Sequence, residues 1–70
     1  MENKEVKNLI ITLEHAKKVR RKRADLMWTK KATAERLKIK PQTLNKVEAG
    51  NYDAPRRIYE SVMNWLIEDL

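Results

Sequence analysis

The stretch TKKATAERLKIKPQTLNKVEAGNYDAP, residues 29–55, decides the fold. Thr29 is a good N-cap residue, which predicts a helix over about residues 30–37. Pro41 suits the first position of a second helix, because its missing N–H is not needed there. Gly50 suits the position just past the end of that helix. The stretch therefore predicts two short helices joined by a tight turn, with its last five residues as a loop.

The second helix, residues 41–49, has two distinct faces when it is drawn at about 100° per residue. Leu44 and Val47 form an apolar face that would pack against the first helix. The opposite face collects polar residues and one small one: Gln42, Asn45, Lys46 and Ala49. Glutamine and asparagine can bond bidentately to adenine and lysine to guanine, so this face has side chains suited to a DNA groove. Any solvated helix face is polar, however, and the pattern alone leaves that simpler explanation open.

Basic residues are concentrated in one part of the chain. The formal net charge is +6 at pH 7, yet residues 17–46 alone hold twelve lysines and arginines against Asp25 and Glu35. This block covers the two predicted helices, which indicates a polyanionic partner. A solvated lysine-rich surface is the alternative. The residues around the two helices that we expect to contact backbone phosphates are Lys30, Lys31, Arg36, Lys40 and Thr43.

The composition argues against several classes of protein. Seventy residues are enough for one domain with a small core. The chain has no cysteine to form a disulfide or a thiolate, and its lone histidine, His15, lacks metal-site spacing. Ser61 has no base nearby in the sequence. No segment resembles a signal peptide or a membrane-spanning helix. We expect one domain over residues 1–70 that is not an enzyme, with no cofactor, no metal, no small-molecule substrate and no membrane partner.

Residues 6–23 allow two interpretations. Their apolar residues recur at helical spacing, which favours one helix. Thr12 could instead cap a shorter helix over about residues 13–24, leaving the preceding residues extended. A lone strand there would have no partner within the chain and would need to pair across a dimer. We favour a helix or a frayed lead-in for residues 6–11, and hence an all-α domain of four to five helices with an N-terminal extension over residues 1–11.

A last helix is expected over about residues 56–68 of the C-terminal segment 56–70. Its apolar residues lie on more than one face, so one face can bury against the domain while another remains. This excess suggests self-association as a homodimer. The alternative is a larger core within one chain, with the N-terminal segment packed over the helix. The expected dimer-interface residues are Tyr59, Met63, Ile67 and Leu70, with Leu9 and Ile11 as further candidates.

From Ala16 to Trp65 the chain resembles the helix-turn-helix domain of the phage Cro and repressor family. The resemblance rests on a small residue in the first helix, on apolar residues around the turn and in the second helix, on the end of that helix and on a proline after the loop. These residues are Ala34, Leu37, Ile39, Leu44, Val47, Glu48-Ala49-Gly50 and Pro55. The resemblance implies a compact, lambda-repressor-like fold. It also implies that Arg23 pairs with Glu48, which lies on the flank of the second helix. This ion pair would link the domain's first helix to the end of the recognition helix.

Four residues depart from the family pattern, and one of them is Met27, which stands where small residues or glycine are common. Lys30 stands where the family usually has a glutamine that faces a phosphate, and lysine can make that contact as a charge. Lys38 stands where the family often has glycine, so either it takes a left-handed conformation or the turn differs. Pro41 replaces a side chain that often reads a base. The resemblance therefore implies base reading by the outward polar residues, the middle one supporting at a phosphate or a base: Gln42, Asn45 and Lys46.

The resemblance implies a sequence-specific DNA-binding transcriptional regulator. Such a protein would act as a dimer on a roughly palindromic site in double-stranded DNA, in the cytoplasm of a bacterial host or a phage-infected cell. The alternative is a helix-turn-helix interaction module of the anti-repressor or antitoxin type, which binds another regulator. The basic block and the outward face of residues 41–49 favour DNA, whereas the apolar excess of residues 56–70 favours the interaction module.

Overall fold

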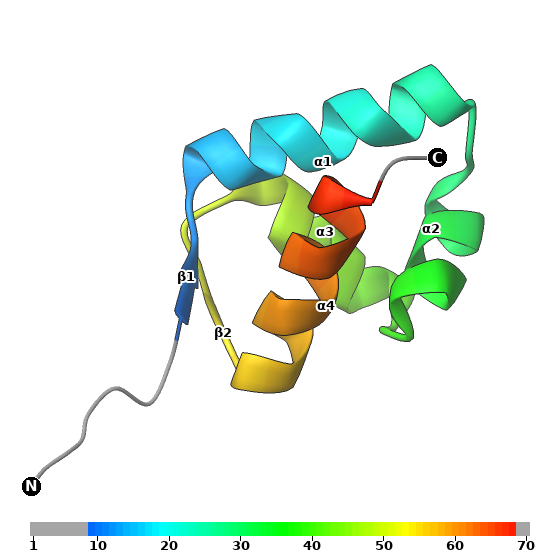
Figure 1. The fold of residues 1–70 in the computed structure, drawn as a ribbon. Helices are drawn as coiled ribbons and strands as arrows, with labels where there is room; N and C mark the ends of the chain where they lie inside the picture. Colours follow the sequence, from blue (N-terminus) through cyan, green and yellow to red (C-terminus); the bar gives the residue numbers. More distant parts are fainter. Residues whose placement is uncertain (1–8, 69–70) are drawn as a thin grey trace, which may run out of the picture.

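Four helices and a two-stranded sheet make up residues 9–68, the part of the chain that the computed structural model describes (Figure 1). The elements in chain order are β1 (Leu9–Ile11), α1 (Leu13–Leu26), α2 (Lys30–Leu37), α3 (Pro41–Ala49), β2 (Tyr52–Ala54) and α4 (Arg56–Ile67). Helix α3 packs against both α1 and α2, and α4 packs across the same two helices. Helix α3, the second helix of the helix-turn-helix, is therefore held by α1 and α2, and it lies behind α4 in Figure 1.

Local capping explains where the helices begin. The Thr12 hydroxyl accepts from the backbone N–H of His15 at 3.1 Å, and the Thr12 N–H donates to His15 Nδ1 at 3.1 Å. The Thr29 hydroxyl accepts from the Ala32 N–H at 3.0 Å. Pro41 occupies the first position of α3. The predicted helices over residues 30–37 and 41–49 are confirmed, and α1 follows the shorter alternative that begins after Thr12.

The preference for a helix or lead-in over residues 6–11 is wrong for residues 9–11, while residues 6–8 lie outside the described part. Residues 9–11 form β1, which pairs antiparallel with β2, so a strand here does have a partner within the chain. Leu9 lies opposite Ala54, and Ile11 opposite Tyr52. The predicted loop after α3 therefore contains a strand, and the domain is mostly helical but not all-α.

The turn that follows α3 explains this pairing. Gly50 has φ +88° and ψ 173°, a conformation essentially restricted to glycine, and Asn51 has φ 52°. These two residues turn the chain back so that β2 runs beside β1. A Cβ on Gly50 would lie 2.7 Å from Leu13 Cδ2 and 3.1 Å from Leu13 Cα. Glycine is therefore needed here both for its backbone conformation and for the close approach of α3 to α1.

The core lies between the helices and one side of the sheet. Ile11 and Ala54 are fully buried, whereas Ile10, between the strand's two inward residues, is 48% exposed. Trp65 is 1% exposed, and its ring stacks on that of half-buried Trp28 at a centroid distance of 6.0 Å. The buried apolar residues are Ile11, Ala16, Val19, Ala34, Leu37, Leu44, Val47, Ala54, Ile58, Val62 and Trp65.

Candidate nucleic-acid interface

The two faces of α3 differ in burial as the angular argument predicts. Leu44 and Val47 are 0% exposed and belong to the core. The polar residues on the other side are exposed: Gln42, Asn45 and Lys46. Burying the apolar side of a nine-residue helix forces its polar side outward. The structure thus brings the three candidate base-reading residues together on one accessible surface, here called the outer face of α3.

Helix α2 begins beside this outer face. Lys30 is the first residue of α2, and its Nζ donates to Asn45 Oδ1 at 3.2 Å. The side-chain oxygen of Asn45 therefore accepts one bond and keeps a second lone pair, while its side-chain amide nitrogen is the group that can donate to a ligand. At the other end of the face, Lys46 Nζ lies 6.0 Å from the centroid of the Tyr52 ring. Neighbouring elements thus help to orient two of the three outward side chains.

The opposite flank of α3 carries a buried ion pair. Arg23 Nε donates to Glu48 Oε2 at 2.7 Å, and Arg23 Nη2 donates to Glu48 Oε1 at 3.2 Å. The Glu48 side chain is 6% exposed and that of Arg23 is 23% exposed. The Arg20 guanidinium also donates to the backbone carbonyl of Glu48. The expected pair is thus present, and α1 fixes the end of α3 through both a bidentate ion pair and a cap on a helix carbonyl.

The turn between α2 and α3 has the left-handed residue that the sequence left open. Lys38 has φ 60° and ψ 45°, and its N–H donates to the Glu35 carbonyl at 3.1 Å. The Ile39 N–H then donates to the Ala34 carbonyl at 2.9 Å, which closes the end of α2. Met27 takes a similar conformation after α1, with φ 58°. Lysine therefore occupies a backbone conformation that favours glycine.

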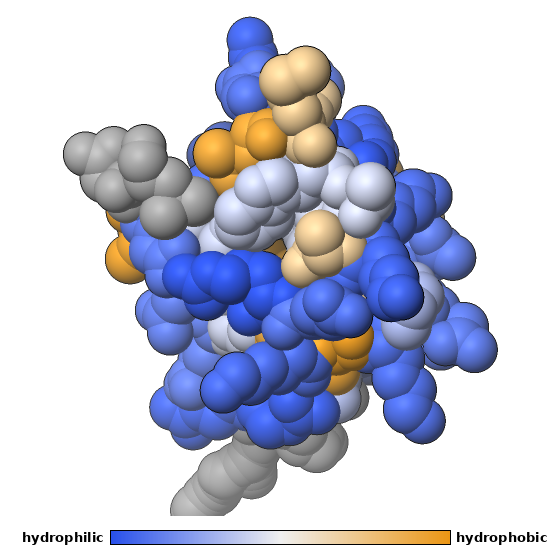
Figure 2. Space-filling model, turned by 90° about the vertical axis from the view of Figure 1, so that its right-hand side faces the viewer, coloured by the Kyte–Doolittle hydropathy of each residue, from blue (hydrophilic) through white to orange (hydrophobic). Residues whose placement is uncertain are grey.

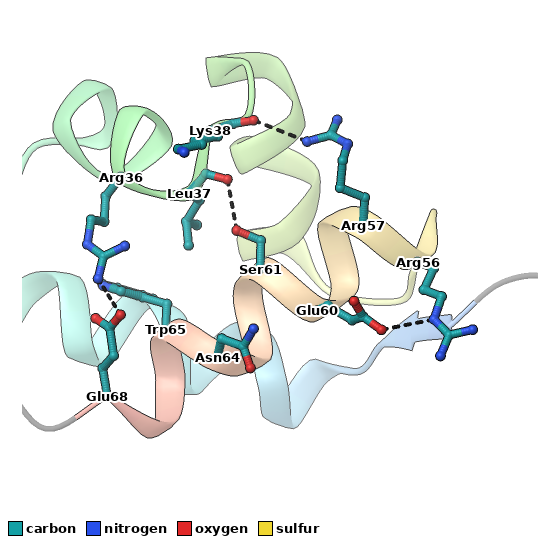
Figure 3. A pocket seen from close by; sticks show the side chains of 10 residues that line it. All are labelled: Arg36, Leu37, Lys38, Arg56, Arg57, Glu60, Ser61, Asn64, Trp65 and Glu68. Carbon is teal, nitrogen blue, oxygen red and sulfur yellow. Dashed lines mark hydrogen bonds and ion pairs between the residues drawn. The ribbon is translucent and has the colours of Figure 1, made fainter.

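The expected phosphate-contacting residues do not all lie together. Lys30, Lys31 and Lys40 are exposed around the ends of α2 and α3, and Thr43 is half-buried beside them. Arg36 lies in the last turn of α2 and pairs with Glu68 instead. It lines a depression of ≈ 680 Å³ between α2 and α4, here called the α2–α4 groove (Figure 3). Arg36 is therefore set apart from the outer face of α3.

The α2–α4 groove also contains contacts that the sequence did not reveal. Ser61 Oγ donates to the Leu37 carbonyl at 2.8 Å, and Arg57 Nη1 donates to the Lys38 carbonyl at 3.4 Å (Figure 3). Both donors belong to α4, and the acceptors are the last carbonyl of α2 and the carbonyl of the turn residue after it. Arg57 was missed because residues 47–57 have balanced charges, although the pair of arginines after Pro55 was a visible signal.

The apolar candidates for self-association differ in exposure. Tyr59 and Met63 are half-buried and pack against the core, so part of the excess on α4 serves the chain's own packing. Ile67 is 80% exposed. Leu70 lies outside the described residues. Ile11, in β1, is fully buried within the chain's own core, so its candidacy for an interface is wrong.

The surface around α2 and the end of α1 is mostly hydrophilic (Figure 2). Its charge comes from the basic block of residues 17–46. Hydrophobic residues gather where α1 ends, and Met27 there is 89% exposed. Within residues 9–68, no group of histidine and acidic side chains could hold a metal ion. None of the described helices is both long enough and apolar enough to cross a membrane.

Comparison with known protein families gives a match. Residues 19–57 match the family profile described as "Helix-turn-helix", a span that runs from the middle of α1 to the first turn of α4. The matched span includes α2, α3 and their turn, together with both partners of the Arg23–Glu48 ion pair. No curated protein and no solved structure matches the chain.

Proposed function

Since this chain belongs to the Cro- and repressor-type helix-turn-helix family of DNA-binding domains, we propose that it is a sequence-specific DNA-binding transcriptional regulator. Helix α3 enters the major groove of double-stranded DNA. One observation carries the proposal: Gln42, Asn45 and Lys46 are exposed together on a helix whose other side is fully buried. A helix held in this way can present its polar side to base edges without disturbing the core.

The outward residues have different roles in this proposal. Gln42 and Lys46 lie about one helical turn apart and read base edges, because their donors and acceptors suit adenine and guanine. Asn45 supports them. Its Oδ1 already accepts from Lys30, which holds the Asn45 side chain beside a residue that we assign to a phosphate. We therefore assign the Asn45 amide nitrogen to a phosphate, with base contact as the second choice.

The cations around the motif supply affinity without sequence preference. Lys30, Lys31 and Lys40 are exposed at the edges of the outer face and contact backbone phosphates, with Thr43 as a hydroxyl donor. Arg36 contributes least in this account, because it must first leave Glu68. Each phosphate contact releases about one counterion, which makes binding strongly dependent on salt.

A second copy of the chain completes the site. One recognition helix contacts only a few base pairs, whereas a twofold dimer places two such helices about 34 Å apart, one turn of DNA. The exposed side chain of Ile67, together with Tyr59 and Met63 beside it on α4, offers the interface, and Leu70 belongs to the same proposal. Because this patch is small, the dimer forms weakly in the absence of DNA.

Selection of bound sites from a random double-stranded DNA pool tests the function. The proposal predicts one enriched sequence with two related half-sites, which binds far more tightly than random DNA in the presence of competitor. Sedimentation with and without the selected duplex should show two copies per duplex. Recovery of no enriched sequence would overturn the proposal and would favour a helix-turn-helix module that binds another protein.

A further inference from the structure

A second depression lies where the α2–α3 turn meets the start of α4. It has a volume of ≈ 440 Å³ and is here called the turn hollow. Three of its lining residues are cations, and they come from both sides of the turn and from α4: Lys38, Lys40 and Arg57. The other lining residues are Ile39, Thr43 and Ile58. No acidic side chain is among the described residues that line it.

The neighbouring α2–α4 groove differs, because it is lined by acidic residues as well as by cations. That groove also contains arginines, but Arg36 pairs with Glu68 and Arg56 pairs with Glu60 at 2.9 Å (Figure 3). Within residues 9–68, by contrast, neither lysine of the turn hollow has an ion-pair partner. Two arginines of the α2–α4 groove are thus paired with acids. The three cations of the turn hollow, of which Lys38 and Arg57 also line the α2–α4 groove, have no acidic partner among the described residues and can bind an external anion.

The backbone at the turn hollow points to the same kind of ligand. Lys40 is the N-cap residue of α3, and its side chain makes no capping hydrogen bond. Pro41 has no N–H, so the first free donors of α3 are the Gln42 and Thr43 N–H groups, which have no side-chain acceptor among the described residues. The helix dipole favours negative charge at this end. Lys38 holds a left-handed conformation that glycine would adopt at lower cost. This local cost is explained if the lysine charge is needed at the hollow.

We propose that the turn hollow binds one phosphodiester group of the DNA backbone. Lys38, Lys40 and Arg57 surround the anion, and the Thr43 hydroxyl and the start of α3 add hydrogen-bond donors. This inference rests on the proposed function and adds Lys38 and Arg57 to the DNA-contacting residues. Because Arg57 belongs to α4, the contact also ties the DNA backbone to the helix that packs across α1 and α2. The bound phosphate thereby limits how α3 can tilt in the major groove of the DNA.

The test uses the full chain and the selected operator, with two substitutions measured separately and together. Lys38→Gly removes a charge while placing the preferred residue in a left-handed position, so the fold should be kept and the Tm unchanged or raised by about 4 °C. Arg57→Ala removes the α4 side of the site. Each should lower the salt slope by about one and weaken binding roughly eightfold at 0.1 M salt, the effect of one released counterion.

Met27→Gly is the matched control, because it also places glycine at a left-handed position, at a residue that does not line the hollow, and removes no charge. It should raise the Tm without altering DNA affinity. Operators with single neutral methylphosphonate linkages then locate the phosphate. One linkage should weaken the wild-type chain but have little further effect on the Lys38→Gly, Arg57→Ala double variant.

The possible failures are distinct. If the wild-type chain binds its operator and both variants keep its affinity and salt slope, the turn hollow is not a phosphate site, and the proposed function stands. If the variants weaken binding but every methylphosphonate linkage affects them as it affects the wild type, the cations act only as a diffuse field, which also overturns the site. A wild-type chain that binds no DNA would overturn the proposed function and the phosphate site together.

Discussion

The two sides of α3, a helix of nine residues, serve different purposes. On the inner side, Leu44 and Val47 are fully buried and Glu48 is tied to Arg23. On the outer side, Gln42 and Lys46 are exposed, so they contribute little to the stability of the fold. The difference teaches that stability and recognition can be separated within one short helix. Substitutions on the inner side should change the free energy of unfolding, and substitutions on the outer side should change DNA affinity.

The largest effect is expected on the inner side. Glu48→Ala leaves Arg23 without its carboxylate in a position that is only 23% exposed. We expect it to lower the free energy of unfolding by about 3 kcal/mol, the lower end of the range for breaking a buried pair. Urea unfolding measures this. Glu35→Ala is the control, because Glu35 is exposed on α2, and it should change stability by less than about 0.5 kcal/mol. Equal effects of the two changes would show that the inner-side ion pair stabilises the fold no more than an exposed glutamate does.

The end of α3 offers a second test of the inner side. Gly50→Ala forces a Cβ to within 2.7 Å of Leu13 Cδ2 at a φ of +88°. We expect a loss of about 2 kcal/mol, since such strained conformations cost about 1–3 kcal/mol for residues with a Cβ. Asn51→Gly is the matched change at the next residue, where φ is 52°, and it should be neutral or stabilising. Thermal unfolding of both variants is the measurement, and an unchanged Tm for Gly50→Ala would contradict the account of this turn.

The outer side should respond in the opposite way. Gln42→Ala should cost about 1–3 kcal/mol of binding free energy on the selected operator and less on random DNA. Its free energy of unfolding should stay within about 0.5 kcal/mol of the wild type, because the side chain is exposed. Titrations of both duplexes, together with urea unfolding, give the two numbers. Equal losses on operator and random DNA would show that Gln42 does not read sequence.

The edge of the outer face should affect affinity without specificity. Lys30→Ala should weaken binding to all DNA sequences similarly and reduce the salt slope by about one, because it removes one phosphate contact. Titration of operator and random duplexes at several salt concentrations checks this. Lys30→Arg keeps the charge and should restore the slope. A loss confined to one base position would instead place Lys30, or the Asn45 side chain that it holds, at a base edge.

Much of the helical part of this fold could be predicted because its signals are local. Thr29, Pro41 and Gly50 mark the bounds of α2 and α3 within the sequence itself. The sheet could not be predicted in the same way, since Ile11 meets Tyr52 across three helices of intervening chain. Each strand has only three residues, too few to show a clear alternation.

The candidate site divides along the same line. The outward position of Gln42 followed from the helical period, and the Arg23–Glu48 pair followed from the family resemblance and the flank position of Glu48. The position of Arg57 beside Lys38 depends on how α4 packs across the end of α2. A local sequence pattern cannot predict that packing. The pairing of Arg36 with Glu68 likewise joins α2 to the residue that follows α4, so the separation of Arg36 from the outer face became visible only in the fold.

The central claim is that the outer face of α3 reads DNA sequence, and parallel selection from a random DNA pool tests it most directly. The wild-type chain and Gln42→Ala are selected side by side under the same salt conditions. The account predicts that the wild type enriches two related half-sites whose centres lie about one helical turn apart. The variant should enrich the same half-sites with the preference lost at one base position in each. Identical enriched sequences from both proteins, or none from the wild type, would contradict the claim.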